Sequence, residues 1–136
     1  MQIIPYDPKY SKLVAAFFRE IFAEMGWKEQ LSDQIDQPQL LFHLPDKGIL
    51  LLVKEKDMVI GTAGLIMLTE ADGLIKRFYL SKSYRGTGLA NSLLDELIKK
   101  AQLLGIKKIL LDVSKKNPRA IRFYVKNGFT KTDVTP

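Results

Sequence analysis

Apolar residues recur every three or four positions in two long stretches of the chain, and this period predicts two amphipathic helices. The first begins at Asp7-Pro8 and ends near Gly26. Its apolar face consists of Val14, Phe17, Phe18, Ile21, Phe22 and Met25. The second follows Gly88 and ends near Gly105. Its apolar face consists of Ala90, Leu93, Leu94, Leu97, Ile98 and Ala101. The glycine after each periodic stretch is a typical helix stop.

Shorter runs of β-branched and other apolar residues predict strands before, between and after these helices. The runs are Gln2–Ile4, Gly48–Val53, Met58–Leu68, Leu74–Leu80, Lys108–Val113 and Phe129–Val134. Charged turns at Lys54–Asp57 and Glu70–Gly73 separate the three central runs, while Trp27–Lys47 is polar and irregular. A last short helix starts at Asn117-Pro118, an N-cap followed by a proline suited to the first helical position, and stops at Gly128.

This order of elements, a β-meander followed by β-α-β-α-β, predicts an α/β domain of three layers with a mixed central sheet. The chain has 136 residues, enough for one hydrophobic core, and shows no repeat or linker. We therefore expect a single domain over residues 1–136.

Composition removes several kinds of chemistry. The chain has no cysteine and one histidine, His43, so we expect no disulfide, no thiolate nucleophile and no metal site. No apolar run is long enough to span a bilayer, and the N-terminus lacks the pattern of a secretory signal. These features predict a cytoplasmic protein without a membrane partner.

The net charge of +6 leaves nucleic-acid binding as one interpretation, which predicts a steep salt dependence of binding. The lysines and arginines are nevertheless spread along the chain rather than gathered in a tail. We therefore expect a solvated basic surface and no nucleic-acid partner.

The segment Arg85-Gly86-Thr87-Gly88-Leu89-Ala90 lies where an apolar strand turns into the second long helix. Glycines at such a junction leave backbone N–H groups bare, and the helix N-terminus adds partial positive charge, so the junction suits a phosphate. A P-loop would need a Lys-Ser/Thr pair where Leu89-Ala90 stand, and a dinucleotide fingerprint would need a glycine at Asn91.

Two motifs resemble the GNAT family of N-acetyltransferases. The pattern R-x-x-G-x-A at Arg85–Ala90 resembles the family's acyl-coenzyme-A-binding motif, and Asn117–Phe129 resembles its later signature N-x-x-A-I-x-F/L-Y-x-x-x-G-F. The motifs occur in the family's order, and the resemblance runs from about Leu50 to Phe129. It implies transfer of an acetyl group from acetyl-CoA directly to a primary amine, without a metal.

The resemblance also implies where the cofactor binds. It would enter a V-shaped gap between two splayed parallel strands, here Leu74–Leu80 and Lys108–Val113, and act as an extra strand. We expect the turn to hold the pyrophosphate mainly through backbone N–H groups, with the Arg85 side chain holding the turn or approaching phosphate. The cofactor-binding residues expected are Phe78, Tyr79, Leu80, Arg85, Gly86, Thr87, Gly88, Leu89, Ala90, Asn91, Asn117 and Tyr124.

Catalysis requires an acid for the leaving thiolate and a base for the amine. Tyr124 matches the tyrosine that serves many relatives as general acid. Asp112 is a candidate base, although a bond to backbone near the strand end is the simpler role for it. Leu74 stands where many relatives carry a glutamate, and Glu70, Asp72 or a water relay are further alternatives.

The acceptor is expected in the region of Trp27–Lys47, whose polar residues include Gln30, Asp33, Asp36 and His43. We expect a small amine or an amino acid as acceptor, with protein acceptors as an alternative, and a monomer or homodimer. The absence of the glutamate at Leu74 keeps a second hypothesis open, a non-catalytic acyl-CoA-binding or regulatory module.

Overall fold

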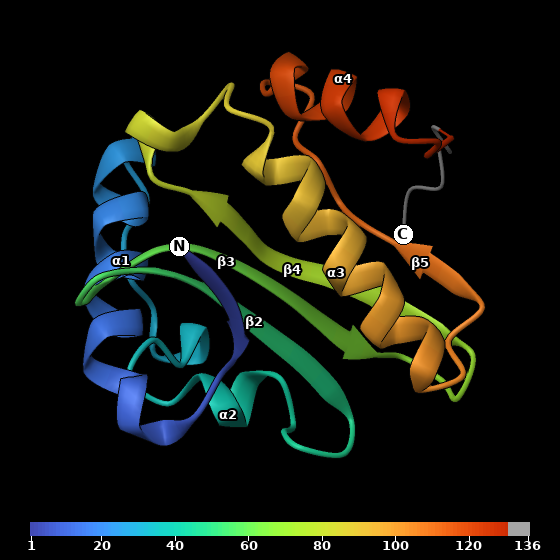
Figure 1. Ribbon diagram of the computed structural model, residues 1–136, viewed down its shortest axis with the longest axis horizontal. Helices are drawn as coiled ribbons and strands as arrows, with labels where there is room; N and C mark the ends of the chain where they lie inside the picture. Colours follow the sequence, from blue (N-terminus) through green and yellow to red (C-terminus); the bar gives the residue numbers. More distant parts are fainter. Residues whose placement is uncertain (131–136) are drawn as a thin grey trace.

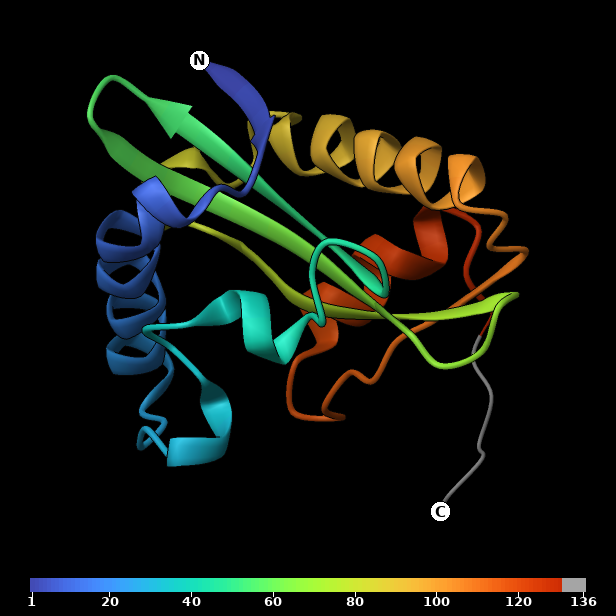
Figure 2. The same cartoon turned by 90° about the horizontal axis from the view of Figure 1, so that it is seen from below.

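The computed structural model describes residues 1–130 and confirms the α/β architecture: one mixed sheet with helices on both faces (Figures 1 and 2). The strands are β1 (Gln2–Pro5), β2 (Gly48–Glu55), β3 (Met58–Met67), β4 (Asp72–Leu80) and β5 (Lys108–Leu110). The helices are α1 (Ser11–Met25), α2 (Pro38–Leu41), α3 (Leu89–Leu103) and α4 (Pro118–Lys126), with 3₁₀ turns at Pro8–Tyr10, Leu31–Asp33 and Lys82–Tyr84.

The sheet order follows the chain, β1-β2-β3-β4-β5, and every pair is antiparallel except β4 with β5. Helices α1 and α2 cover one face of this sheet, while α3 and α4 lie on the other (Figure 2). Because β2 and β3 are covered on both faces, most of their residues are buried, and these strands are largely apolar without alternation.

Each face of the sheet has its own core. On the α1 face the buried side chains of the helix pack with Ile35, Phe42 and alternate residues of β2. On the α3 face Leu93, Leu94 and Leu97 pack with residues of β3 and β4. The predicted helical faces are thus the faces that pack on the sheet, except that Met25, in the last turn of α1, is 43% exposed. Among residues 1–130 no helix is both long and apolar enough to cross a membrane.

Several element boundaries differ from the sequence prediction. A 3₁₀ turn precedes α1, β2 runs on to Glu55, and β4 already begins at Asp72, because strand pairing continues into the turns. The predicted strand Lys108–Val113 is wrong beyond Leu110, where pairing with β4 stops. In the predicted strand Phe129–Val134, residues 129 and 130 are in no strand, and the others lie outside the described residues.

An irregularity interrupts the pairing of β3 with β4. The register shifts between Thr62 and Gly64, and the facing residue Arg77 has φ of 56°, in the left-handed region. The buried Thr62 hydroxyl donates to the Arg77 carbonyl oxygen at 2.6 Å and so satisfies a group that the ladder leaves out. Such a bulge turns the following strand and its side chains relative to the rest of the sheet.

Gly64 lies where β3 and β4 pass under the fully buried ring of Phe42. A Cβ at Gly64 would lie 2.2 Å from that ring and 2.7 Å from the Lys76 carbonyl oxygen, so the neighbours would have to move. We expect Gly64→Ala to lower the free energy of unfolding by about 1–3 kcal/mol, as overpacked core substitutions do.

A double-mutant cycle in urea tests this cause. In combination with Phe42→Leu, which removes the ring atoms nearest the new methyl, Gly64→Ala should cost clearly less than it does alone. Strictly additive costs would show that the ring contact is not what excludes a side chain at this position.

Candidate functional site

The pairing of β4 with β5 covers only three residues on each strand. Asp72, Gly73 and Leu74 face Lys108, Ile109 and Leu110, and no later residue of β4 pairs with the chain that follows β5 within residues 1–130. Beyond this point the two segments diverge, one leading to the glycine turn and the other to α4 (Figure 1). Residues Ile75–Leu80 therefore present backbone groups that can pair with an added extended molecule.

The glycine turn connects β4 to α3 and has the conformation that its sequence requires. Gly86 and Gly88 have φ of 77° and 87°, values that L side chains rarely adopt, and Gly88 is the N-cap of α3. In the part of the chain described, the N–H groups of Gly86, Thr87, Gly88, Ala90 and Asn91 donate no hydrogen bond. The turn thus offers a row of free donors at a helix N-terminus, which is suited to a phosphate.

Side chains of α1 hold the glycine turn in place. Arg85 donates to both carboxylate oxygens of Glu24 through Nη1 and Nη2 and, through Nε at 3.1 Å, to the Leu80 carbonyl oxygen. Ser81 donates to Glu20, one helical turn before Glu24, at 3.0 Å. The Arg85 side chain therefore holds the turn, and its two terminal nitrogens are engaged by Glu24.

The surroundings of Glu24 are electropositive. The hydrogen bonds from Arg85 lower the pKa of the Glu24 carboxyl, against a smaller opposite effect of burial, and the charges of Arg85, Lys82 and Arg119 add to the lowering. Since Arg119 comes from the first turn of α4, positive charge from two elements meets beside the glycine turn. This field favours an anionic ligand.

Helix α4 begins where the sequence predicts it, directly after Asn117. The Asn117 side chain accepts a hydrogen bond from the Ala120 N–H at 3.2 Å, which makes Asn117 the N-cap, and Pro118 is the first helical residue. Tyr124 is 8% exposed, with its ring centroid 6.0 Å from that of Phe78 on β4 and 5.5 Å from that of Phe129. Burial raises the pKa of Tyr124, and Tyr79 adds to the shift, so the phenol keeps its proton at neutral pH.

Alternation along β4 sends its last side chains to opposite faces. Phe78 packs in the α3-side core and contacts Phe123 and Tyr124, whereas the Tyr79 ring lies 6.4 Å from that of Phe18 on α1 and 6.2 Å from that of Trp27. Leu80 is buried on the α3 side. These side chains fill the two cores, so a ligand in the gap would meet the backbone of this segment.

The candidate bases are scattered. Asp112 is exposed beyond the end of β5. Leu74 pairs with Ile66 and Leu110 at the last paired position. Glu70 lies in the β3–β4 turn and Asp72 is the first residue of β4, so six residues of extended strand, about 20 Å, separate Asp72 from Phe78.

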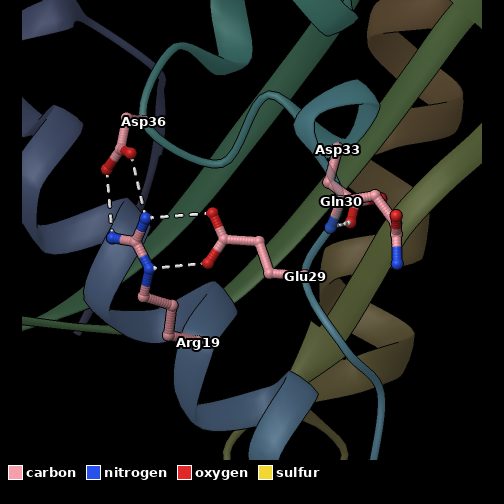
Figure 3. A network of polar contacts seen from close by, with 5 residues as sticks. All are labelled: Arg19, Glu29, Gln30, Asp33 and Asp36. Atoms are coloured by element: carbon pink, nitrogen blue, oxygen red, sulfur yellow. Dashed lines mark hydrogen bonds and ion pairs between the residues drawn. The ribbon is translucent and has the colours of Figure 1, made fainter.

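The segment 27–37 lies across the α1 face and is held there by ion pairs (Figure 3). Arg19 on α1 donates to Glu29 at 3.0 and 3.1 Å and to Asp36 at 3.0 and 2.9 Å. The Asp33 carboxylate accepts the Gln30 N–H at 2.7 Å, and the Asp33 carbonyl oxygen accepts from Arg77 at 3.0 Å. His43 is exposed and belongs to the loop after α2.

Three residues of this site escaped the sequence analysis: Glu24, Thr62 and Arg77. Glu24 and Thr62 act on positions 61 and 15 residues away, and no local pattern indicates such partners. Arg77 did leave a signal, because a cation within the apolar run Leu74–Leu80 departs from the strand pattern.

The chain belongs to the acetyltransferase (GNAT) family, because the sequence model of that family matches residues 13–129. This match confirms the resemblance carried by the two motifs. An uncharacterised N-acetyltransferase of Mycobacterium bovis is 35% identical over 80 residues, which are 59% of this chain and 51% of that protein. The chain thus spans about half the length of the curated relatives it matches.

Solved structures of the family have the same fold. An acetyltransferase of the GNAT family from Staphylococcus aureus superposes with a TM-score of 0.81 at 28% identity, over 98% of this chain and 92% of that one. A predicted acetyltransferase from Clostridium acetobutylicum, solved with acetyl-CoA, superposes with a TM-score of 0.81 at 21% identity, over 99% and 93%. At that identity the second comparison supports the fold alone.

The Glu24–Arg85 pair yields a pH-dependent prediction. Because the folded-state pKa of Glu24 lies below its usual 4.5, the pair stabilises the fold above that pH, and the stabilisation is lost as pH falls through the lowered value. We expect Glu24→Gln to cost about 0.5–1 kcal/mol at pH 7, a modest value because both side chains are partly exposed.

Urea unfolding of both proteins from pH 7 to pH 3 measures this difference. The gap between wild type and Glu24→Gln should narrow as the pH drops below about 4.5. The matched control is Glu20→Gln, whose partner Ser81 carries no charge, so its gap should stay nearly constant. A Glu24→Gln gap that is independent of pH would contradict the assigned pairing.

Proposed function

We propose that the protein is an acetyl-CoA-dependent N-acetyltransferase that acts on a primary amine. The observation that carries the proposal is the combination of the free N–H groups of Gly86, Thr87, Gly88, Ala90 and Asn91 with the unpaired edge of β4, both at the same end of the sheet. Coenzyme A matches this pair in chemistry, with a pyrophosphate for the turn and amides for the strand edge. Family membership supports the same reaction.

In the proposed complex the cofactor lies against the backbone of Phe78, Tyr79 and Leu80, with its pyrophosphate on the turn. Gly86, Thr87, Gly88, Ala90 and Asn91 supply free backbone N–H groups there, and Leu89 supplies an N–H that must first leave the Thr87 hydroxyl. Asn117 contacts the pantetheine while capping α4. Arg85 acts on the cofactor through the shape of the turn, since Glu24 holds its guanidinium.

Transfer proceeds by attack of the neutral amine nitrogen on the thioester carbonyl carbon. The C–N bond forms, the C–S bond breaks, and the products are the N-acetylated amine and coenzyme A as the free thiol. Tyr124, whose phenol is protonated at neutral pH, gives its proton to the departing thiolate. The exposed carboxylate of Asp112, or water, takes one proton from the attacking nitrogen, and that proton returns through solvent to the Tyr124 phenolate.

A non-catalytic acyl-CoA-binding module is the second candidate. Leu74 occupies the position where many relatives carry a glutamate, and its partners are the apolar residues Ile66 and Leu110. Such a module would bind acetyl-CoA without releasing thiol in the presence of amines, which separates the two functions in one assay.

Isothermal titration with acetyl-CoA tests the cofactor site. Gly88→Val should raise the dissociation constant at least about tenfold, because a β-branched residue cannot hold φ near 87° and the N–H row would turn away. Gly105→Val is a matched control, since Gly105 has φ of 85° and equally open surroundings at the other end of α3. Equal loss of affinity in both variants, or in neither, would contradict the placement.

Replacement of Tyr124 by phenylalanine separates chemistry from binding. We expect kcat for amine-dependent thiol release to fall about 100-fold or more, with the acetyl-CoA affinity changed less than about twofold, because only the proton donor is removed. Tyr10→Phe is the control, since that ring packs in the α1-side core under Lys54. An unchanged kcat in Tyr124→Phe would exclude Tyr124 as the acid.

A further inference from the structure

The guanidinium of Arg77 is buried beneath the segment 27–37. It lies on the α1 face of the sheet, whereas α3 lies on the other face. Its side chain is 9% exposed and lies over the rings of Phe18 and Phe22, with centroids 5.0 and 5.2 Å from the guanidinium carbon. The bulge at this residue, with its positive φ and its carbonyl held by Thr62, aims the side chain there. The fold thus directs a long cationic side chain into an apolar core.

The charge of this guanidinium is only partly matched. Nη2 donates to the Asp33 carbonyl oxygen at 3.0 Å and lies 3.4 Å from one Asp33 carboxylate oxygen, beyond the usual length of a strong charged hydrogen bond. Nη1 is buried and has no partner in the described part of the chain. The other Asp33 carboxylate oxygen is taken by the Gln30 N–H.

Burying this guanidinium without a partner for Nη1 costs free energy, unless a ligand accepts the missing hydrogen bond. A buried cation with an unmatched donor loses hydration that a neutral carbonyl cannot replace. Burial accordingly lowers the pKa of Arg77. A guanidinium presents paired donors that fit a carboxylate through two parallel hydrogen bonds, and Nη1 and Nη2 are the pair that Asp33 satisfies incompletely.

Arg77 also lies beside the reacting groups of the proposed function. It immediately precedes Phe78 and Tyr79, whose backbone forms the proposed cofactor strand, and it lies past the last β4–β5 pair. Phe78 and Tyr124 approach the gap from the α3 side, whereas Arg77 and Tyr79 belong to the α1 side. An amine that enters from the α1 side would therefore pass Arg77 on its way to the thioester.

We propose that Arg77 binds a carboxylate of the acceptor, so that the acceptor is an amine carrying a carboxylate close to its nitrogen, as an amino acid does. This inference rests on the proposed function and narrows its acceptor class. The carboxylate forms two hydrogen bonds with Nη1 and Nη2 and thereby orients the amine toward the gap between β4 and β5.

The acceptor carboxylate takes the place that Asp33 occupies. The segment 27–37 is anchored by the Trp27 ring, which packs on Phe22 and Tyr79, and by the buried Ile35. The exposed pairs of Arg19 with Glu29 and Asp36 (Figure 3) add only about 0–1 kcal/mol each. Most side chains of Trp27–Gln30 are exposed as well. Displacing Asp33 from Arg77 therefore breaks few strong contacts, while a bidentate carboxylate supplies stronger ones.

The test compares matched acceptors on the wild-type protein. Thiol release from acetyl-CoA is measured with the α-amino acids, β-alanine and γ-aminobutyrate, and with the carboxamide of each, which keeps the amine and removes the negative charge. We expect kcat/KM for at least one acid to exceed that for its amide by about tenfold to a hundredfold, the range of a charged hydrogen bond. In Arg77→Gln that ratio should fall to near one, and in Arg77→Lys it should be intermediate.

Lys76→Gln is the matched control, because it removes a positive charge from the exposed neighbouring position of β4 and should keep the wild-type ratio. Amides used as well as their acids by the wild type, no transfer to any acid, or a ratio that survives in Arg77→Gln would each overturn the inference. If Arg77→Gln does not fold, the wild-type ratio and Arg77→Lys decide the matter. Titration with acetyl-CoA is read separately, so a failed cofactor site is distinguished from a wrong acceptor class.

Discussion

The early end of the β4–β5 ladder is the constraint on which the rest of the site depends. A parallel pair normally satisfies the backbone groups on both facing edges, yet here pairing stops at Leu74 and Leu110. The free edge of β4, the exit of the chain toward α4 and the position of Tyr124 beside Phe78 all follow from that divergence. A longer β5 would close the gap and leave the glycine turn without a continuous path to the reacting groups.

Helix α1 is the second element that the site requires, although it lies outside both of the motifs at Arg85–Ala90 and Asn117–Phe129. Glu20 and Glu24, near its C-terminal end, bond to Ser81 and Arg85 beside the glycine turn, and its aromatic rings pack against the Arg77 guanidinium. One helix thus fixes both the turn after β4 and the bulge within it. Because α1 packs tightly in the α1-side core, it keeps the glycine turn and the bulge at Arg77 in fixed positions relative to each other.

The two faces of the sheet divide the proposed chemistry between them. Helices α3 and α4 lie on the cofactor side and supply the N–H row and the phenol. The α1 side holds the partly matched guanidinium under a segment fastened by exposed ion pairs. The weak contact of Asp33 with Arg77 can be exchanged for a ligand, whereas the motifs on the other face are built into helix ends.

The sequence by itself determined the class of fold, the helix faces, the N-cap at Asn117 and the glycine conformations at the turn, because each depends on local periodicity or on the φ that a residue tolerates. It also indicated the family through two short motifs. Only the tertiary structure decided that β5 ends at Leu110, that Glu24 holds Arg85, and that Thr62 pins a bulge which buries Arg77. These depend on contacts between residues far apart in the chain, where the partner of a group is chosen by the packing of whole elements and leaves no local pattern to read.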